Sequence, residues 1–291
     1  MNLKTAKVNI KMIKFNLHTH SKYCDGQKSI EDMIQGALKY NIKIIGITPH
    51  GPLPFETDWT MDKKDLEKYF KEVSFLKNKY RDKIEVLIGM ELDYLPDLKM
   101  DYINKNMLKR LDFWIGSNHF LGKLSNGYYW TVDYTIEEIN RGVKENFNGS
   151  IKSAISRYYD YMKDMILNYE PTILGHLDLI KKNNGNNLLF NEEEDWYRDK
   201  IFEVIETITS SKTVVEVNTG GKYRGYSSEY YPSRWILEEI YSRKIPITVS
   251  RDAHDIESLN YDYEESLSHL KEIGFTSIVY LKNNKWNELK I

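Results

Sequence analysis

Short apolar runs and longer amphipathic segments alternate along most of the chain. The short runs are rich in isoleucine, valine and leucine, which is typical of buried strands. In the longer segments apolar residues recur at helical spacing, as at Leu66, Phe70 and Val73. The predicted strands are 13–17, 43–48, 84–90, 112–117, 172–174, 213–217, 245–249 and 276–281. The predicted helices are 29–41, with Ser29 as its N-cap, 62–79, 99–109, 151–168, 194–209, 232–243 and 256–272.

Strands that alternate with helices indicate an α/β fold, because parallel strands need a crossover connection. Seven or eight such units fit a closed or distorted barrel better than a two-domain open sheet, although spacing alone does not separate the two. We expect a polar leader over 1–11 and one domain over 12–291. Segment 120–134 is predicted as an irregular insertion that shapes a pocket, and 181–187 as an exposed loop.

Composition narrows the class of protein. The 291 residues include 41 Lys and Arg against 43 Asp and Glu, so the formal charge is -2 and no basic surface for nucleic acid is expected. Cys24 is the one cysteine, which excludes a disulfide within the chain. No apolar run approaches the roughly 18 residues that span a bilayer. We therefore expect a cytoplasmic protein that acts on a small molecule, with no membrane partner.

Histidines mark one end of the predicted strands. His18 and His20 are one residue apart on an extended backbone and point to the same side, which alone is a weak sign of metal binding. Six of the seven histidines, however, follow the carboxyl ends of predicted strands. These six are His18, His20, His50, His119, His176 and His254, and Glu91 and Asp252 have similar positions. His269 is different, because it lies on a predicted helix face.

In a barrel the carboxyl ends of the strands converge on one face, so these residues are predicted to form a metal site. Imidazole and carboxylate ligands suit Zn²⁺, Mn²⁺ and Fe²⁺, and a thiolate set typical of structural zinc is missing from the sequence. Six histidines with two or three carboxylates exceed what one ion can use. We therefore expect two or three divalent metal ions with a bridging carboxylate.

At these segments the chain resembles the PHP superfamily, and within it the monofunctional histidinol-phosphate phosphatases. The matching segments are His18–Ser21, Thr48–His50, Gly89–Asp93, Ile115–Gly122, Leu174–Leu179, Glu216–Gly221 and Asp252–His254. The resemblance implies a distorted (β/α)7 barrel of the TIM type and a site with three metal ions. The implied ligand sets are His18, His20, Glu91 and Asp252; Glu91, His119 and His176; and His50, His254 and Asp25.

The sequence departs from the family pattern at three positions. Gly26 stands where relatives often have a metal-binding histidine, and we take the neighbouring Asp25 as its substitute. Pro49 replaces the usual aspartate before His50 and could change the orientation of that ring. Arg251 stands where a serine is common; it could contact phosphate or point away.

The activity implied by the resemblance is hydrolysis of L-histidinol phosphate to L-histidinol and phosphate by a metal-bound hydroxide. Asp252, His254 and His176 are the expected catalytic residues. Arg224 and Arg157 are candidates for phosphate binding, since arginine suits phosphate oxygens. Side chains that could select the substrate are Asp93, Asp178 and Tyr128 to Trp130, whereas Cys24 is predicted to pack near the site.

Two alternatives remain from sequence alone. One is a phosphoesterase of the same superfamily that acts on another small phosphate ester or a nucleotide. The other is a regulatory or binding protein that holds metal without catalysis. The identity of the native metal and the oligomeric state cannot be read from the sequence, and a homo-oligomer is possible.

Overall fold

The computed structural model describes residues 13–98 and 105–291, which form two parallel sheets. The first has the order β1 (Lys14–Asn16), β2 (Ile42–Ile47) and β3 (Glu85–Ile88). The second has the order β10 (Ile247–Ser250), β9 (Val214–Asn218), β8 (Ile173–Leu174), β5 (Ile115–Ser117) and β4 (Glu91–Asp93). The α/β class is therefore confirmed. The predicted strand 84–90 corresponds to β3, and β4 follows it as an unpredicted strand.

Two isolated parallel bridges connect the sheets. Thr19, just after β1, pairs with Ala253, just after β10. His50, after β2, pairs with Glu91 at the start of β4. The carboxyl ends of strands from both sheets consequently lie next to one another, which places the histidines that follow them in one region.

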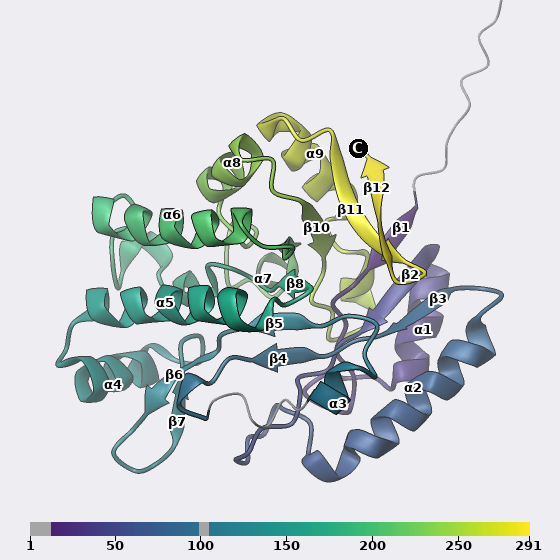
Figure 1. The fold of residues 1–291 in the computed structure, drawn as a ribbon, viewed down its shortest axis with the longest axis horizontal. Helices are drawn as coiled ribbons and strands as arrows, with labels where there is room; N and C mark the ends of the chain where they lie inside the picture. Colours follow the sequence, from purple (N-terminus) through teal and green to yellow (C-terminus); the bar gives the residue numbers. More distant parts are fainter. Residues whose placement is uncertain (1–12, 99–104) are drawn as a thin grey trace, which may run out of the picture.

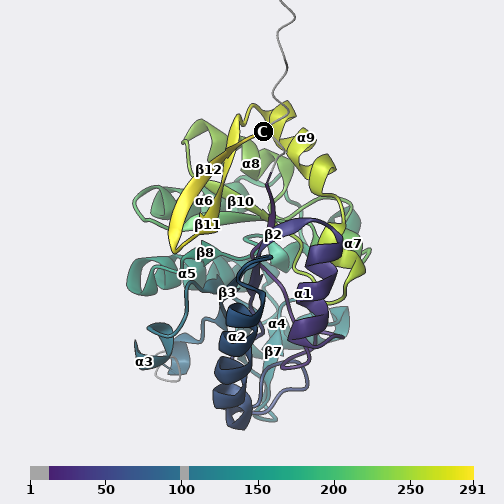
Figure 2. The same ribbon diagram turned by 90° about the vertical axis from the view of Figure 1, so that its right-hand side faces the viewer.

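The helices cover the outside of these sheets, with α1 and α2 on one side of the molecule and α5 and α6 on another (Figures 1 and 2). The α-helices are α1 (Ile30–Lys39), α2 (Leu66–Tyr80), α3 (Lys105–Leu108), α4 (Ile136–Phe147), α5 (Ile151–Tyr169), α6 (Asp195–Thr209), α7 (Gly220–Tyr223), α8 (Arg234–Ser242) and α9 (Tyr263–Ile273). Short 3₁₀ helices are η1 (Lys63–Asp65), η2 (Pro96–Leu98), η3 (Leu179–Lys181), η4 (Gly185–Asn187) and η5 (Glu257–Asn260). None of the described helices is long and apolar enough to cross a membrane.

Local sequence explains where these elements begin and which face they bury. Ser29 caps α1 as predicted: its side chain accepts from Asp32 N while the Asp32 side chain accepts from the Ser29 backbone. The buried face of α1 carries Met33, Ile34 and Ala37, which pack on the isoleucines of β2. Both faces of the parallel strands are covered, so their apolar residues join one continuous core.

Several predicted connections are wrong. Segment 120–134 is not irregular: β6 (Phe120–Lys123) and β7 (Tyr129–Thr131) form an antiparallel hairpin, followed by the unpredicted helix α4. Segment 181–187 is not simply exposed, because Lys181 and Asn184 are buried. The last predicted strand, β11 (Ser277–Lys282), pairs with an unpredicted partner, β12 (Lys285–Lys290). The predicted leader 1–11 and part of the predicted helix 99–109 lie outside the described residues.

Candidate metal centre and active site

The carboxylate of Glu91 lies at the centre of the histidines, and its two oxygens face different rings. Glu91 Oε2 is 3.1 Å from His18 Nε2, 3.4 Å from His20 Nε2 and 3.0 Å from His50 Nδ1. Glu91 Oε1 is 3.0 Å from His176 Nε2 and 3.8 Å from His119 Nε2. One buried carboxylate thus separates two sets of imidazole nitrogens, which is the arrangement of a carboxylate that bridges two metal ions.

A second layer of carboxylates holds the outer ring nitrogens. His18 Nδ1 donates to Glu216 Oε1 at 2.6 Å, and His119 Nδ1 donates to Asp93 Oδ1 at 2.8 Å. Glu216 Oε2 also accepts from the backbone N of His176 at 2.8 Å, so this one side chain contacts two histidines. A carboxylate at one ring nitrogen fixes the tautomer and leaves the other nitrogen free for a metal.

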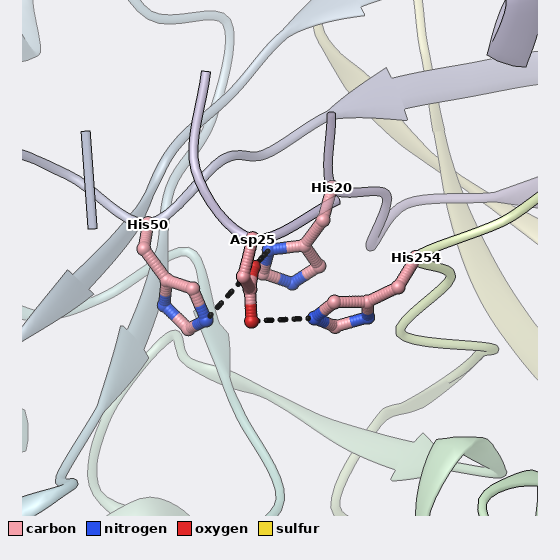
Figure 3. A group of neighbouring side chains, drawn as sticks. All are labelled: His20, Asp25, His50 and His254. Carbon is pink, nitrogen blue, oxygen red and sulfur yellow. Dashed lines mark hydrogen bonds and ion pairs between the residues drawn. The ribbon is translucent and has the colours of Figure 1, made fainter. Parts of the chain in front are cut away.

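Asp25 is placed among three imidazoles, as Figure 3 shows. Its Oδ2 lies 3.2 Å from His254 Nε2, and its Oδ1 lies 3.6 Å from His20 Nδ1 and 4.0 Å from His50 Nε2. Its neighbour Gly26 allows the loop to turn this tightly, because a Cβ there would lie 2.3 Å from Ser21 N. A histidine at position 26 does not fit this backbone, so the carboxylate of Asp25 takes the place beside His254.

Asp252 completes the group on the side of β10. Its Oδ1 is 3.1 Å from His20 Nε2 and 3.7 Å from His18 Nε2, while its Oδ2 accepts from Arg224 Nη2 at 2.8 Å. The backbone of Asp252 has φ of 48°, in the left-handed region that aspartate tolerates better than most residues. Arg224 Nη1 also donates to the Asp252 carbonyl. This arginine, which follows α7, thus contacts both the side chain and the backbone of Asp252.

The charges in this group favour cation binding. Burial disfavours ionisation of Glu91, but His50 and His18 outweigh it and hold the pKa of this carboxyl well below its usual range. Burial likewise opposes protonation of His18, yet Glu216, Asp252 and Glu91 raise its pKa well above the ordinary value. At His20 burial, together with His254 and His50, lowers the pKa to about 3. The carboxylates that raise the pKa of His18 attract any cation, and a divalent ion would take the place of the proton, because ionised carboxylate and neutral imidazole are the forms that bind metal.

The residues fit divalent ions in their chemistry as well as their position. His20 Nε2 and His50 Nδ1 are buried and lie 3.1 and 3.0 Å from oxygens of Asp252 and Glu91, without the geometry of a hydrogen bond. Ligand atoms gather in groups that could each hold an ion: His18, His20 and Asp252; Glu91, His119 and His176; His50, Asp93 and His119; and His20, Asp25, His50 and His254. Nitrogen and carboxylate donors without thiolates suit Zn²⁺, Mn²⁺ or Fe²⁺.

A cavity of about 500 Å³ opens above this group. Its floor contains Glu91, Asp252 and the four histidines His50, His119, His176 and His254. Its walls include Arg224, Lys182 and Asp133, together with aromatic side chains. The aromatic residues of the wall are Trp59, Tyr134, Tyr223, Tyr226 and Tyr231. The cavity can therefore hold a small anionic molecule that has an additional flat or apolar part.

Comparison with known proteins identifies the family. The model of the PHP domain family matches residues 16–220, which is more than half of the chain. The chain belongs to the PHP family. The histidinol-phosphatase of Bacillus subtilis is 27% identical over 274 residues, covering 88% of this chain and 99% of that protein.

Solved PHP structures share the fold. HisK of Listeria monocytogenes superposes with a TM-score of 0.77 at 24% identity, over 87% of this chain and 99% of that one. Histidinol phosphate phosphatase of Lactococcus lactis, crystallised with zinc, L-histidinol and phosphate, gives 0.69 at 21% identity, over 94% of this chain and 98% of that one. The arrangement of elements is therefore that of these proteins.

The structure brings the nine predicted metal ligands of this PHP chain together. They are His18, His20, Asp25, His50, Glu91, His119, His176, Asp252 and His254. Arg224 lies beside them, but Arg157 does not line the cavity. Arg157 is exposed on α5 against the Tyr161 ring, because its neighbours Tyr158 and Tyr159 occupy the buried face of that helix. The structure therefore gives no support to the prediction that Arg157 binds phosphate.

Most candidates for substrate selection are occupied elsewhere. Asp178 is buried and accepts from Ser233 N and Oγ at 2.9 and 2.7 Å, outside the cavity. Asp93 lies against His119, and Trp130 is buried against α4. Tyr128 is 71% exposed at the hairpin tip.

Three other side chains that the sequence analysis considered lie outside the group of metal ligands. Arg251 points away from the site: its guanidinium lies over the Tyr263 ring and donates to the Phe15 carbonyl. Cys24 packs against His20 Nδ1 at 3.4 Å, as predicted for a packing residue near the site. His269 lies on α9 against Tyr230, away from the metal centre.

Sequence reasoning gave no role to Glu216, Asp133, Lys182 or Trp59. Glu216 has a signal in hindsight, since it is an acidic residue inside the apolar strand Val214–Asn218, on the same face as Asn218. Trp59 packs edge-on against His50 with ring centroids 4.6 Å apart, but it comes from a loop without a periodic pattern. Asp133 and Lys182 follow the hairpin and the 3₁₀ turn that were predicted wrongly.

Proposed function

We propose that this PHP protein is a metal-dependent phosphomonoesterase that hydrolyses L-histidinol phosphate to L-histidinol and phosphate, a step of histidine biosynthesis. The observation that carries the activity is Glu91, whose two oxygens face separate sets of histidines beneath a cavity. The substrate assignment is supported by the Bacillus subtilis relative named histidinol-phosphatase, which matches over nearly its full length. The Lactococcus lactis structure, with L-histidinol and phosphate bound, shares the fold.

The proposal includes a distorted (β/α)7 barrel. It is supported by the strand order within the two sheets and by the bridges Thr19 to Ala253 and His50 to Glu91, which join neighbouring strands across the sheet edges. With β3 and β4 counted as one interrupted strand, the two parallel sheets of the described residues contain seven strands. Closure matters for function because it brings ligands from the first and last strands together.

The proposed ligands form three sets, for two or three ions of Zn²⁺, Mn²⁺ or Fe²⁺. The sets are His18, His20, Glu91 and Asp252; Glu91, His119 and His176; and His50, His254 and Asp25. When bound, such ions polarise the phosphate ester and lower the pKa of a coordinated water. Glu216 and Asp93 act through the histidines that they hold, by fixing the tautomers of His18 and His119.

The remaining roles belong to side chains that face the cavity. Arg224 has a rigid guanidinium that already neutralises Asp252 and lies at the cavity wall, so we assign it to the phosphate oxygens. Asp252, His254 and His176 line the floor where the ester must lie, and we assign them to catalysis. His176 follows the carboxyl end of β8, and Asp252 and His254 follow that of β10.

The proposal also covers the wider setting. A formal charge of -2 without a basic surface supports a small-molecule phosphate ester over nucleic acid as the partner. We propose a cytoplasmic location, where histidine biosynthesis takes place. A homo-oligomer is compatible with the function, and sizing the purified protein in solution tests it.

The direct test is phosphate release from L-histidinol phosphate by protein loaded with Zn²⁺ or Mn²⁺, with elemental analysis of the bound metal. We expect two or three ions per chain and a clear preference for L-histidinol phosphate over nucleoside monophosphates and p-nitrophenyl phosphate. Equal turnover of all these esters would contradict the assignment of L-histidinol phosphate as the substrate and would indicate a phosphatase of broad specificity. Bound metal without phosphate release from any ester would contradict the enzymatic assignment and favour a binding protein.

A further inference from the structure

One ion pair in the cavity wall has no part in the metal centre. Lys182 Nζ lies 3.1 Å from Asp133 Oδ2, and the side chains are only 18% and 22% exposed. Lys182 also lies over the Tyr226 ring, 4.3 Å from its centroid. Both charged groups line the cavity, so a bound molecule meets a cation and an anion side by side.

The backbone ties each member of this pair to a predicted metal ligand. Val132 N donates to the His119 carbonyl at 2.8 Å, which fixes Asp133 beside His119 at the end of the β6–β7 hairpin. Leu179 N donates to the His176 carbonyl at 2.9 Å, and Lys182 N then donates to Leu179 O at 2.9 Å. The pair is therefore held next to the two histidines that share Glu91 Oε1.

L-Histidinol phosphate carries charges of both signs close together. Its ammonium group and its phosphate ester stand on neighbouring carbons, so the reacting phosphate has a cation near it. A lysine beside an aspartate can pair with both charges: the carboxylate binds the ammonium and the lysine binds the phosphate. The carboxylate can keep its contact with the lysine, because it accepts hydrogen bonds from two cations at once. A substrate bound the other way round would place its phosphate against the aspartate and its ammonium against the lysine, and this repulsion costs binding energy.

We propose that Asp133 and Lys182 select substrates that carry an ammonium group next to the phosphate ester, with Asp133 binding the ammonium and Lys182 a phosphate oxygen. The inference rests on the proposed phosphatase function and names the groups that recognise its substrate. Lys182 then adds to Arg224 as a second cation of the cavity, and both lie against the Tyr226 ring. Asp133 makes the enzyme specific for amino alcohol phosphates.

The other carboxylates of the cavity are less suited to this role. Asp25, Glu91 and Asp252 belong to the metal centre. Asp255 accepts from Tyr223 OH at 3.1 Å and from Ser258 N at 2.7 Å, so it is engaged in the turn that begins η5. Asp58 is exposed at the cavity mouth, where water screens its charge. Asp133 is the half-buried carboxylate beside His119.

The test compares two esters that differ only in the amine: L-histidinol phosphate and imidazolepropanol phosphate. For each variant the ratio of the two kcat/KM values is measured. We expect Asp133→Asn to lower this ratio roughly 10- to 100-fold, since a hydrogen bond to a charged group is lost. Lys182→Gln should lower kcat/KM for both esters and change the ratio less.

A matched control exists elsewhere in the molecule. Lys222 Nζ lies 2.6 Å from Asp262 Oδ2 and over the Tyr230 ring at 4.9 Å, so this pair copies the geometry outside the active-site cavity. Asp262→Asn should leave the ratio at the wild-type value. Thermal unfolding of each variant shows whether a uniform loss of activity reflects a damaged fold.

The outcomes separate the two proposals. If wild-type protein does not hydrolyse L-histidinol phosphate, the proposed function fails. If the wild type prefers the amine-bearing ester and Asp133→Asn keeps that preference, the present inference fails alone. A loss of preference in Asp58→Asn instead of Asp133→Asn would move the ammonium to the cavity mouth and also overturn it. A uniform loss in Asp133→Asn with an unchanged ratio assigns the pair a purely structural role.

Discussion

Two regions of the interior bury charged side chains, and they differ in how many imidazole rings surround each carboxylate. Beside β8, Lys181 Nζ lies 3.0 Å from Asp178 Oδ2, and Ser233 donates to that carboxylate from both its backbone and its hydroxyl. The buried carboxylate faces one lysine there, and the Nζ of that lysine also lies 3.4 Å from Glu229 Oε2. Around Glu91, in contrast, rings crowd together: the centroids of His20 and His254 are 4.0 Å apart.

The difference distinguishes a buried ion pair that stabilises the fold from a buried group of side chains that binds a ligand. The Lys181 pair exchanges its contacts with water for contacts within the protein, so burial is compensated. At the metal centre several imidazoles share one carboxylate oxygen instead, since Glu91 Oε2 lies within 3.4 Å of ring nitrogens of His18, His20 and His50. The first network holds η3 against the segment before α8. The second requires cations from outside the chain.

The largest effect should come from the shared carboxylate. Glu91→Gln removes the charge between the two sets of histidines while it keeps the size of the side chain. We expect kcat/KM to fall roughly 10³-fold or more, because losing metal ions forfeits several kcal/mol of transition-state stabilisation. The measurement is L-histidinol phosphate turnover with elemental analysis of the same sample.

Glu145→Gln, on the surface of α4, is the control for this change and should retain both metal and activity. Full metal content in Glu91→Gln would contradict this distinction between the two regions, since the other ligands would then bind the metal without the Glu91 carboxylate. The far-ultraviolet circular dichroism spectrum checks that the variant has folded.

Loss of charge in the Lys181–Asp178 pair should affect stability and not metal binding. Lys181→Met leaves the Asp178 charge buried without its cation, and we expect the free energy of unfolding to fall by about 3–5 kcal/mol. Urea denaturation of the metal-free protein measures this. The metal content of the folded variant should match that of the wild type.

A second substitution sharpens the test of the Lys181 pair. Lys181→Met combined with Asp178→Asn removes both charges while an amide oxygen can still accept from Ser233, so much of the lost stability should return. Metal loss in the single variant without loss of stability would show that this pair belongs to the metal site after all.

A smaller effect is expected at the carboxylate behind the histidines. Glu216→Gln keeps a hydrogen bond to His18 but no longer stabilises the tautomer and charge that a metal needs. We expect metal affinity to weaken about 10- to 100-fold, as for other carboxylates that hold a ligating histidine. Competition with a coloured chelator gives the affinity, and the exposed Glu206→Gln on α6 is the control. An unchanged affinity would make Glu216 a packing residue.

Sequence predicted the repeated elements well because their signal is local. The isoleucine run of β2 was placed within a residue of its position at either end, and Ser29 was identified as the cap of α1. The hairpin β6–β7 and helix α4 were missed, because β6 and β7 are short and the apolar residues of α4 are few among charges. Strand β12 has no fully buried residue and therefore lacks a clear apolar pattern.

The site was predictable only in part for the same reason. Histidines could be recognised because they follow buried strands, whose carboxyl ends meet wherever the helices cross over. Asp133 and Lys182 depend on how a hairpin and a 3₁₀ turn fold back towards His119 and His176, which no local pattern records. Glu216 lies within a strand, so its inward direction follows from alternation, but its partner His18 is distant in the sequence.

The smallest effect should be at Arg157, whose exposed charge belongs to neither buried network. Because its guanidinium lies on the outer surface of α5 over Tyr161, water already solvates it. We expect Arg157→Ala to change the free energy of unfolding by no more than about 0.5 kcal/mol and to leave kcat/KM at the wild-type value. Arg224→Ala, assayed alongside, should lose activity because that arginine contacts Asp252 inside the cavity. A fall in kcat/KM for Arg157→Ala comparable to that of Arg224→Ala would mean that α5 approaches the substrate during turnover. Arg157 would then belong to the active site and not to the outer surface.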